Sequence, residues 1–387
     1  LPLPIKITDG LINRIDAKLE YSAESINIAG NYSIKDVDVA FDQHSFKGNL
    51  EALHTDITLK NNTIALKGSY AFNNVHLVSS PYALTGSFTA EFDDFLFNSP
   101  EDITTKASLK TDKIYLQLSE NQFFQGKLTL LVKEGHLQKD TASLDGQLMI
   151  QQALLTLGKE QSFAGNLDIP HIKLNKDHNQ TRVQLDALLN PFDLHLPGKT
   201  LKGNLKADQF TLKIDEKNNL SFDGQLSVNH GDVQVDKTSL KGDLKLENLN
   251  ASYDITNQTA KVKSRGEMTD IIIKTEDNKT FKTHVGFDLN LNYPLKTPSD
   301  MQYDGSLSLD KSSLEGLAFG NINDINLKSQ FKTNSADISL LSLSFLDTPI
   351  IASGHVANFS KPVLDIQAQS ERIDLSKLSL LAPELLK

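Results

Sequence analysis

Apolar and polar residues alternate along most of this chain, and one five-residue pattern recurs: apolar, polar, glycine, polar, apolar. Three copies stand close together at 201–205, 222–226 and 240–244. Successive side chains of a β-strand point to opposite faces, so the two apolar residues and the glycine share one face. The pattern therefore predicts strands with one apolar face and one solvated face.

The copies return at a nearly constant interval. Most neighbouring copies are 18–21 residues apart, and degenerate copies surround Gly266 and Gly286 in the longest gap. A period in this range is typical of repeat architectures. The glycines at the centres of the strict copies are Gly30, Gly48, Gly68, Gly86, Gly126, Gly146, Gly165, Gly203, Gly224, Gly242 and Gly305.

Polar clusters between the glycines predict tight turns, because Asn and Asp tolerate the backbone angles that hairpins require. Since natural strands usually have about five to eight residues, we interpret each period as two short antiparallel strands, and the chain as a meander of about 18 or 19 hairpins. The predicted turns lie at 60–62, 177–179, 216–219, 256–258 and 276–279.

These patterns predict an all-β fold, an elongated and curved antiparallel β-sheet built from hairpin repeats that forms a groove over residues 1–372. Helical periodicity is nearly absent, and only the amphipathic C-terminal segment 373–387 predicts a short helix, interrupted by Pro383. Glycine inside a strand normally weakens it, so its recurrence needs a reason. It either lets the sheet bend sharply or leaves room for a molecule that approaches the apolar face closely.

Composition narrows the possible functions. The apolar fraction of 39% is low for a globular core, and no linker divides the chain. The absence of Cys excludes disulfides and thiol chemistry, and the net charge of −10 argues against nucleic-acid binding. The first residues lack a signal-peptide pattern, so we expect a processed segment whose membrane anchor is missing.

No catalytic arrangement emerges from the sequence. The ten His residues show no metal-type spacing, no nucleophile motif surrounds a Ser, and no glycine-rich phosphate loop opens a helix. We therefore expect a protein that is not an enzyme and that uses no metal or cofactor.

The repeated apolar-x-Gly-x-Leu strands resemble those of the AsmA-like family of periplasmic proteins, whose relatives include TamB, YdbH and YhdP. The resemblance is strongest at 350–354 (Ile-Ile-Ala-Ser-Gly), 362–368 (Pro-Val-Leu-Asp-Ile-Gln-Ala) and 373–378 (Ile-Asp-Leu-Ser-Lys-Leu). It implies a periplasmic location, an inner-membrane anchor outside this chain, and a bridge-like β-groove that carries phospholipid between the inner and outer membranes of a Gram-negative cell. It implies further envelope protein partners and no catalytic residue.

The alternation itself indicates which side chains would contact acyl chains, although each of them also fits an ordinary sheet core. The candidate groove residues are Phe46, Leu50, Leu128, Leu148, Leu167, Leu201, Leu205, Leu212, Ile214, Phe222, Leu226, Val228, Val233, Val235, Leu240, Leu244 and Leu246.

Two alternatives remain open at this stage. A parallel β-helix, as in a surface or adhesin fibre, also has coils of about 20 residues, and its apolar face would be a sealed core. A TamB-like role in outer-membrane protein assembly would instead use an exposed sheet edge to pair with a client strand.

Overall fold

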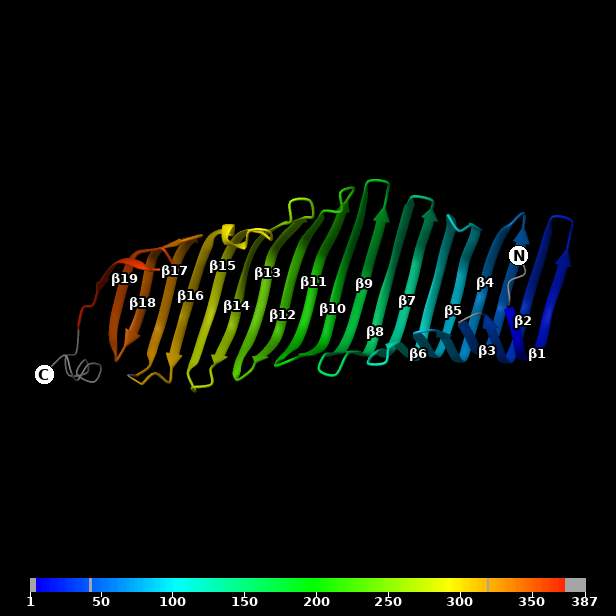
Figure 1. Cartoon of the computed structure of the whole chain (residues 1–387), viewed down its shortest axis with the longest axis horizontal. Coiled ribbons are helices and arrows are strands. Elements are labelled where there is room, and N and C mark those ends of the chain that lie inside the picture. Colours follow the sequence, from blue (N-terminus) through cyan, green and yellow to red (C-terminus); the bar gives the residue numbers. More distant parts are fainter. Residues whose placement is uncertain (1–4, 42–43, 319, 373–387) are drawn as a thin grey trace. The chain divides into compact units, whose positions relative to one another are not determined.

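The computed structural model describes residues 5–41, 44–318 and 320–372, and this part of the chain is almost entirely β-strand (Figure 1). Its one helical element is the short 3-10 helix η1 (Pro298–Asp300). The chain divides by its contacts into two units, Leu1–Pro197 and Gly198–Lys387. The predicted C-terminal helix at 373–387 lies outside the described residues.

Unit 1 contains ten strands, each antiparallel to the next in sequence. They are β1 (Ile5–Tyr21), β2 (Ser25–Phe41), β3 (His44–Lys60), β4 (Thr63–Ser79), β5 (Tyr82–Ser99), β6 (Asp102–Ser119), β7 (Gln122–Gln138), β8 (Thr141–Leu157), β9 (Ser162–Lys176) and β10 (Gln180–Leu196).

Unit 2 contains ten further strands with the same antiparallel order. They are β11 (Lys199–Asp215), β12 (Leu220–Val235), β13 (Thr238–Asp254), β14 (Thr259–Lys274), β15 (Thr280–Pro294), β16 (Gln302–Glu315), β17 (Ile322–Lys332), β18 (Ser335–Phe345), β19 (Thr348–Ala357) and β20 (Val363–Gln369).

The all-β class and the antiparallel hairpin connections are confirmed, and so are all five predicted turns. Because every strand pair of the described chain is antiparallel, the parallel β-helix is excluded. The prediction that each period contains two short strands is wrong. A period of about 20 residues holds one long strand and one turn, as in β3 with its 17 residues, rather than two short strands.

A break in the alternation near the middle of the strands explains that error. In β11 the apolar face is formed by odd-numbered residues up to Ala207 and by even-numbered residues from Phe210 onward, with Gln209 at φ 52° between them. Such a bulge inserts one residue and keeps the apolar side chains on one face while the sequence parity changes. In the sequence, consecutive polar residues at a bulge resemble those of a turn, so they indicate the end of a strand.

Nine bulge residues share this left-handed backbone conformation, with φ between 46° and 54°. The ladder is interrupted beside them, so their amide groups need other acceptors. They are Asp36, His54, Asn74, Gln152, Gln209, His230, Asp270, Lys311 and Asp324.

The polar residue after the motif glycine supplies that acceptor for several bulges. The amide of His54 donates to Asn31 Oδ1 at 2.7 Å, and Asn31 follows Gly30. The amide of Gln152 donates in the same way to Asn166 Oδ1 at 2.7 Å. Equivalent bonds join Asp36 to Asn49, Asn74 to Ser87 and His230 to Asp243. The polar residue after the motif glycine therefore also accepts a hydrogen bond from a bulge amide on the neighbouring strand.

The motif glycine itself lies against the neighbouring backbone at the bulge. A Cβ on Gly68, at φ 119°, would come within 2.8 Å of the His54 carbonyl oxygen and 2.7 Å of the Thr55 Cα. A Cβ on Gly165 would lie 2.6 Å from the Pro191 carbonyl oxygen. Of the two explanations for the glycines, these contacts support the bend, because the space beside each glycine is filled by protein backbone.

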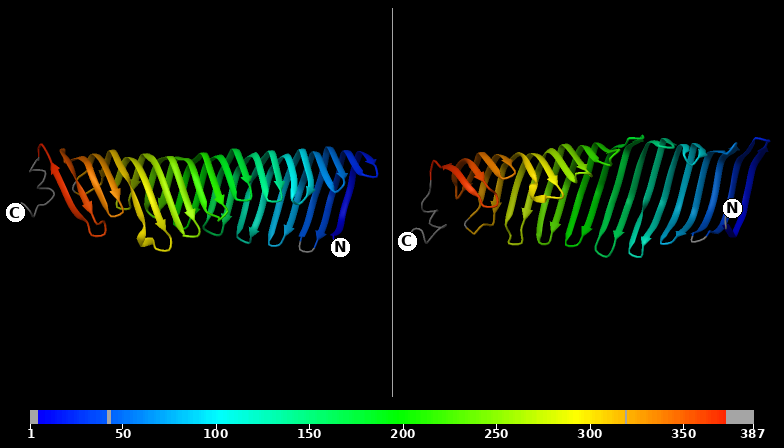
Figure 2. Two further views of the ribbon diagram at one scale, coloured as in Figure 1. Left: turned by 90° about the horizontal axis from the view of Figure 1, so that it is seen from above. Right: turned by 45° about the horizontal axis from the view of Figure 1, so that its top comes forward.

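The bends turn the sheet of each unit toward its apolar face. The strands are curved in both units (Figure 2). Thr55, Val75 and Ser312 each follow a bulge directly, and their exposed fractions are only 2%, 2% and 0%. Neither face of a flat single-layer sheet would be covered to this extent. Their burial therefore follows from curvature, with side chains of adjoining strands converging over the bend.

We predict that Gly165→Ala lowers the free energy of unfolding by about 1–3 kcal/mol, the usual range for overpacking, because the new methyl group meets backbone. Gly286→Ala is the matched control, since its Cβ would meet only the rotatable Ser308 hydroxyl. Chemical denaturation followed by circular dichroism measures both. Equal losses in the two variants would contradict the assigned role of Gly165.

We predict that Asn31→Ala destabilises unit 1 by about 1 kcal/mol, because the His54 amide loses its acceptor. Asn31→Asp keeps a side-chain oxygen at this position, as Asp243 does at the equivalent bond in unit 2, and we expect it to retain most of the stability. The same denaturation measurement applies. If the Asp variant were as unstable as the Ala variant, the hydrogen bond would not be the cause.

Candidate functional site

The apolar face extends over the strands of each unit. The described residues contain no helix apart from η1 and no second sheet that could cover it. Antiparallel residues directly opposite each other place their side chains on the same face, so the strand register identifies the neighbours across this face.

One row of apolar side chains crosses all ten strands of unit 2 without interruption. Leu205 is opposite Val228, which is opposite Leu244, and the pairing continues strand by strand. From β11 to β20 the row contains Leu205, Val228, Leu244, Met268, Val285, Leu309, Leu327, Leu341, Ala352 and Ala368.

Unit 1 contains a corresponding row over nine strands. It also includes two tyrosines, so it is less uniform than the row of unit 2. From β1 to β9 its members are Ile15, Tyr32, Ala52, Tyr70, Ala90, Leu109, Leu130, Leu148 and Ile169.

The structure places all seventeen predicted groove residues in strands, and none of them is fully buried. Sixteen are half-buried, and Val235 is 38% exposed. Within unit 2 many pair with one another, as Leu212 does with Phe222 and Val233 with Leu240. In unit 1, Leu50 is opposite Phe72, and Leu128 and Leu167 both face Ile150.

The members of these rows that lie outside the strict copies of the motif, such as Leu109, Met268 and Leu327, were not predicted from the sequence. The signal that could have found them is the switch of the apolar positions from odd to even numbers, or the reverse, within one strand. Recognising that switch as a bulge would have extended each apolar face across the full strand.

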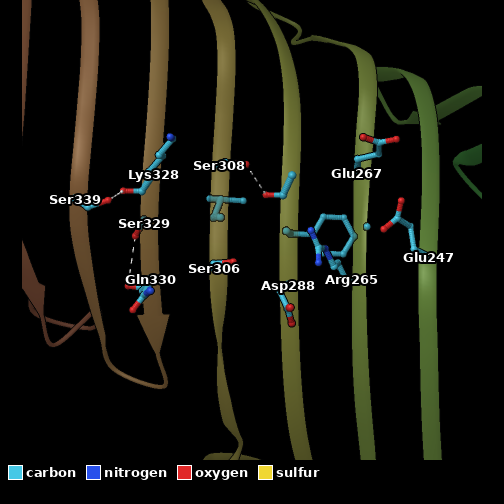
Figure 3. A pocket seen from close by; sticks show the side chains of 14 residues that line it. Glu247, Arg265, Glu267, Asp288, Ser306, Ser308, Lys328, Ser329, Gln330 and Ser339 are labelled. Carbon is cyan, nitrogen blue, oxygen red and sulfur yellow. Dashed lines mark hydrogen bonds between the residues drawn. The ribbon is translucent and has the colours of Figure 1, made fainter.

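The opposite face is polar and contains a depression in unit 2 with a volume of about 660 Å³ (Figure 3). Arg265 pairs across the ladder with Asp288, and the small residues Ser306 and Ser308 leave the space between the strands open. Charged residues of both signs line it, together with several Ser residues. The labelled lining residues are Glu247, Arg265, Glu267, Asp288, Ser306, Ser308, Lys328, Ser329, Gln330 and Ser339.

Two phenol groups introduce polarity on the apolar face of unit 1. Tyr32 lies on β2 and Tyr70 on β4, and the Tyr70 hydroxyl donates to the Lys67 carbonyl oxygen at 3.4 Å. Burial raises the pKa of Tyr70 to about 12, and the Tyr32 phenol adds to the shift. Burial also raises the pKa of Tyr32. Both groups are therefore neutral near neutral pH.

The described residues contain no group of three or more His, Asp or Glu side chains that could hold a metal ion. In the same residues, no helix has both the length and the hydrophobicity for crossing a membrane. Comparison of the chain with protein families, with characterised proteins and with solved structures finds no match. The chemistry of the two faces is therefore the basis for a functional proposal.

We predict that the stability of unit 1 falls as the pH rises from about 10 to about 12, because the unfolded chain ionises Tyr70 first while the folded protein holds it neutral. Tyr70→Phe should reduce that fall by an amount on the order of 2 kcal/mol. Denaturation midpoints of both proteins across this pH range, with tyrosinate absorbance, measure it. Identical pH profiles would contradict the raised pKa.

Proposed function

We propose that this protein binds phospholipid acyl chains on the apolar faces of its units and carries phospholipid between the inner and outer membranes of the Gram-negative envelope. The observation that supports this proposal best is the uninterrupted apolar row of unit 2, most of whose members are half-buried and over which the described chain places no second layer. A contiguous apolar surface of this extent is unusual for a soluble monomer and commonly marks a binding site.

The energetics of lipid movement fit such a surface. A phospholipid with about 30 methylene groups, at roughly 0.8 kcal/mol each, meets a cost on the order of 25 kcal/mol when it enters water. A surface that covers the acyl chains removes most of this cost. No reaction is needed, which agrees with the expectation that the protein is not an enzyme.

The dimensions also fit. Eight residues of a strand span about 26 Å, whereas an acyl chain in a membrane spans about half of the roughly 30 Å hydrocarbon core. One arm of a bent strand is therefore long enough to lie beside a whole acyl chain. The polar headgroup would then remain at the margin of the sheet, in contact with water.

Photo-crosslinking tests the proposal directly. We expect crosslinkers at Leu205 or Leu244, on the apolar face, to capture phospholipid in cells, and those at Lys202 or Lys206, on the opposite face of β11, to capture none. Asp243 is a poor control because its carboxylate accepts the His230 amide at 2.6 Å. Equal capture on the two faces would contradict acyl-chain binding.

Lipid extraction from the purified protein with mass spectrometry is the companion experiment. Copurified phospholipid is the expected result, and it should decrease in Leu205→Asp, where a charge interrupts the row. Lys202→Asp changes a side chain of the same strand on the polar face and serves as the matched control. A protein without bound lipid would count against the proposal.

A second candidate function is assistance in outer-membrane protein assembly, and one edge strand favours it. All seven residues of β20 are exposed, with Val363 at 64% and Leu364 at 62%. Within the described residues, β20 pairs with β19 alone. Pairing with a client strand would use this edge. Crosslinkers at Leu364 that capture an outer-membrane protein would support this function, whereas capture of lipid alone would not.

A further inference from the structure

The apolar face of unit 2 is least covered at its last strand. Leu364 and Ile366 of β20 are 62% and 45% exposed, and they lie opposite Val356 and Gly354 of β19. Val356 has a strand on either side and is half-buried. Among the described residues no strand lies beyond β20, so nothing there covers its two large apolar side chains.

The apolar row of unit 2 also becomes smaller at this end. After Leu327 and Leu341 on β17 and β18, its members on β19 and β20 are Ala352 and Ala368. The face beside Ile366 is therefore formed by small side chains. Large apolar groups from another segment can pack there without meeting a further Leu.

The chain leaves β20 close to this face, and its path is held by hydrogen bonds. The Ser370 hydroxyl donates to the Pro349 carbonyl oxygen of β19 at 2.7 Å, and it also lies 3.1 Å from the Arg372 carbonyl oxygen. Residues 373–387 begin at this point. Six extended residues reach up to about 20 Å, which takes Leu378 as far as Ile366, four residues or about 13 Å before Ser370 on the strand.

The segment that begins there is amphipathic. It contains six Leu residues, and in the helix that its sequence predicts, four of them recur at spacings of three and four and share one side, with Lys377 opposite. An apolar surface tethered this closely meets the segment at an effective concentration in the millimolar range. The four residues are Leu375, Leu378, Leu381 and Leu385.

We propose that the leucine side of residues 373–387 docks on the apolar face of β19 and β20 and covers Leu364 and Ile366. This segment is the occupant because it starts beside the face, is long enough to cross it and carries the apolar side chains that the face lacks. The docked segment closes the end of the apolar row. One consequence rests on the proposed function: acyl chains would then be confined to the strands before β19.

Disulfide formation tests the docking, since the chain has no Cys and two introduced cysteines can form only one intramolecular bond. We expect Ile366→Cys to crosslink with Leu378→Cys or Leu381→Cys under mild oxidation. Asp365→Cys, on the opposite face of β20, is the matched control. The yield at position 366 should exceed that at 365 by about tenfold or more, a ratio that burial of one Leu side chain supports. Non-reducing electrophoresis and peptide mass spectrometry measure both yields.

A free tether would reach both faces of an edge strand, so equal yields at 365 and 366 would overturn the docking. The absence of a disulfide at both positions would overturn it as well. In the Ile366→Cys, Leu378→Cys protein, Leu381→Asp should lower the yield about tenfold, whereas Lys377→Asp should leave it unchanged. Circular dichroism verifies the folding of each variant.

The disulfide test needs no lipid, so the two proposals can fail separately. A disulfide at 366 in a protein that copurifies without phospholipid would support the docking and count against the proposed function. Copurified phospholipid with equal yields at 365 and 366 would support the proposed function and overturn the docking.

Discussion

The close approach of a glycine to the bulge on the next strand is the contact on which the architecture depends. A long strand with strict alternation would form a flat ribbon whose apolar face lies open to water. Here one inserted residue bends each bulged strand, and the glycine opposite permits the two backbones to meet. The residue after that glycine accepts the amide that the bulge releases, as Asn31 does for His54. The curvature of the sheet and the hydrogen bonds at the bulge therefore both depend on three positions: the bulge residue, the motif glycine and the polar residue after that glycine.

This bend also determines which apolar residues are buried and which remain accessible. The residues beside a bend, such as Val75 and Ser312, are covered by neighbouring side chains, and they stabilise the curve. The larger residues on either side of it, such as Leu205 and Leu244, stay half-buried. The protein stabilises its own sheet at the bends and leaves the remaining apolar surface uncovered by other described elements. The proposed binding of acyl chains depends on this remaining apolar surface.

Much of this fold was predictable from sequence, because alternation and turn chemistry are local. The turn at Asn61 and Asn62 and the apolar face of Leu201 and Leu205 both follow from neighbouring residues. The strand length did not, because a bulge and a turn both appear as a pair of polar residues. His54 is polar for a bulge and Asn218 is polar for a turn, and only the pairing partner distinguishes them. The placement of Tyr32 and Tyr70 in one row was equally hidden, since they are 38 positions apart and lie on either side of Ala52 on a third strand.

Because each repeat consists of one strand and one turn, such a protein can become longer or shorter by gaining or losing single repeats. Most of the motif glycines face a bulge of an adjacent strand, whichever direction that strand runs, so the match survives when a single repeat is lost or duplicated. Each event of about 20 residues would add or remove one strand spacing of roughly 4.8 Å while leaving the sidedness of the sheet intact. Size is therefore adjustable in small increments, and neither a paired duplication nor a redesigned terminus is required.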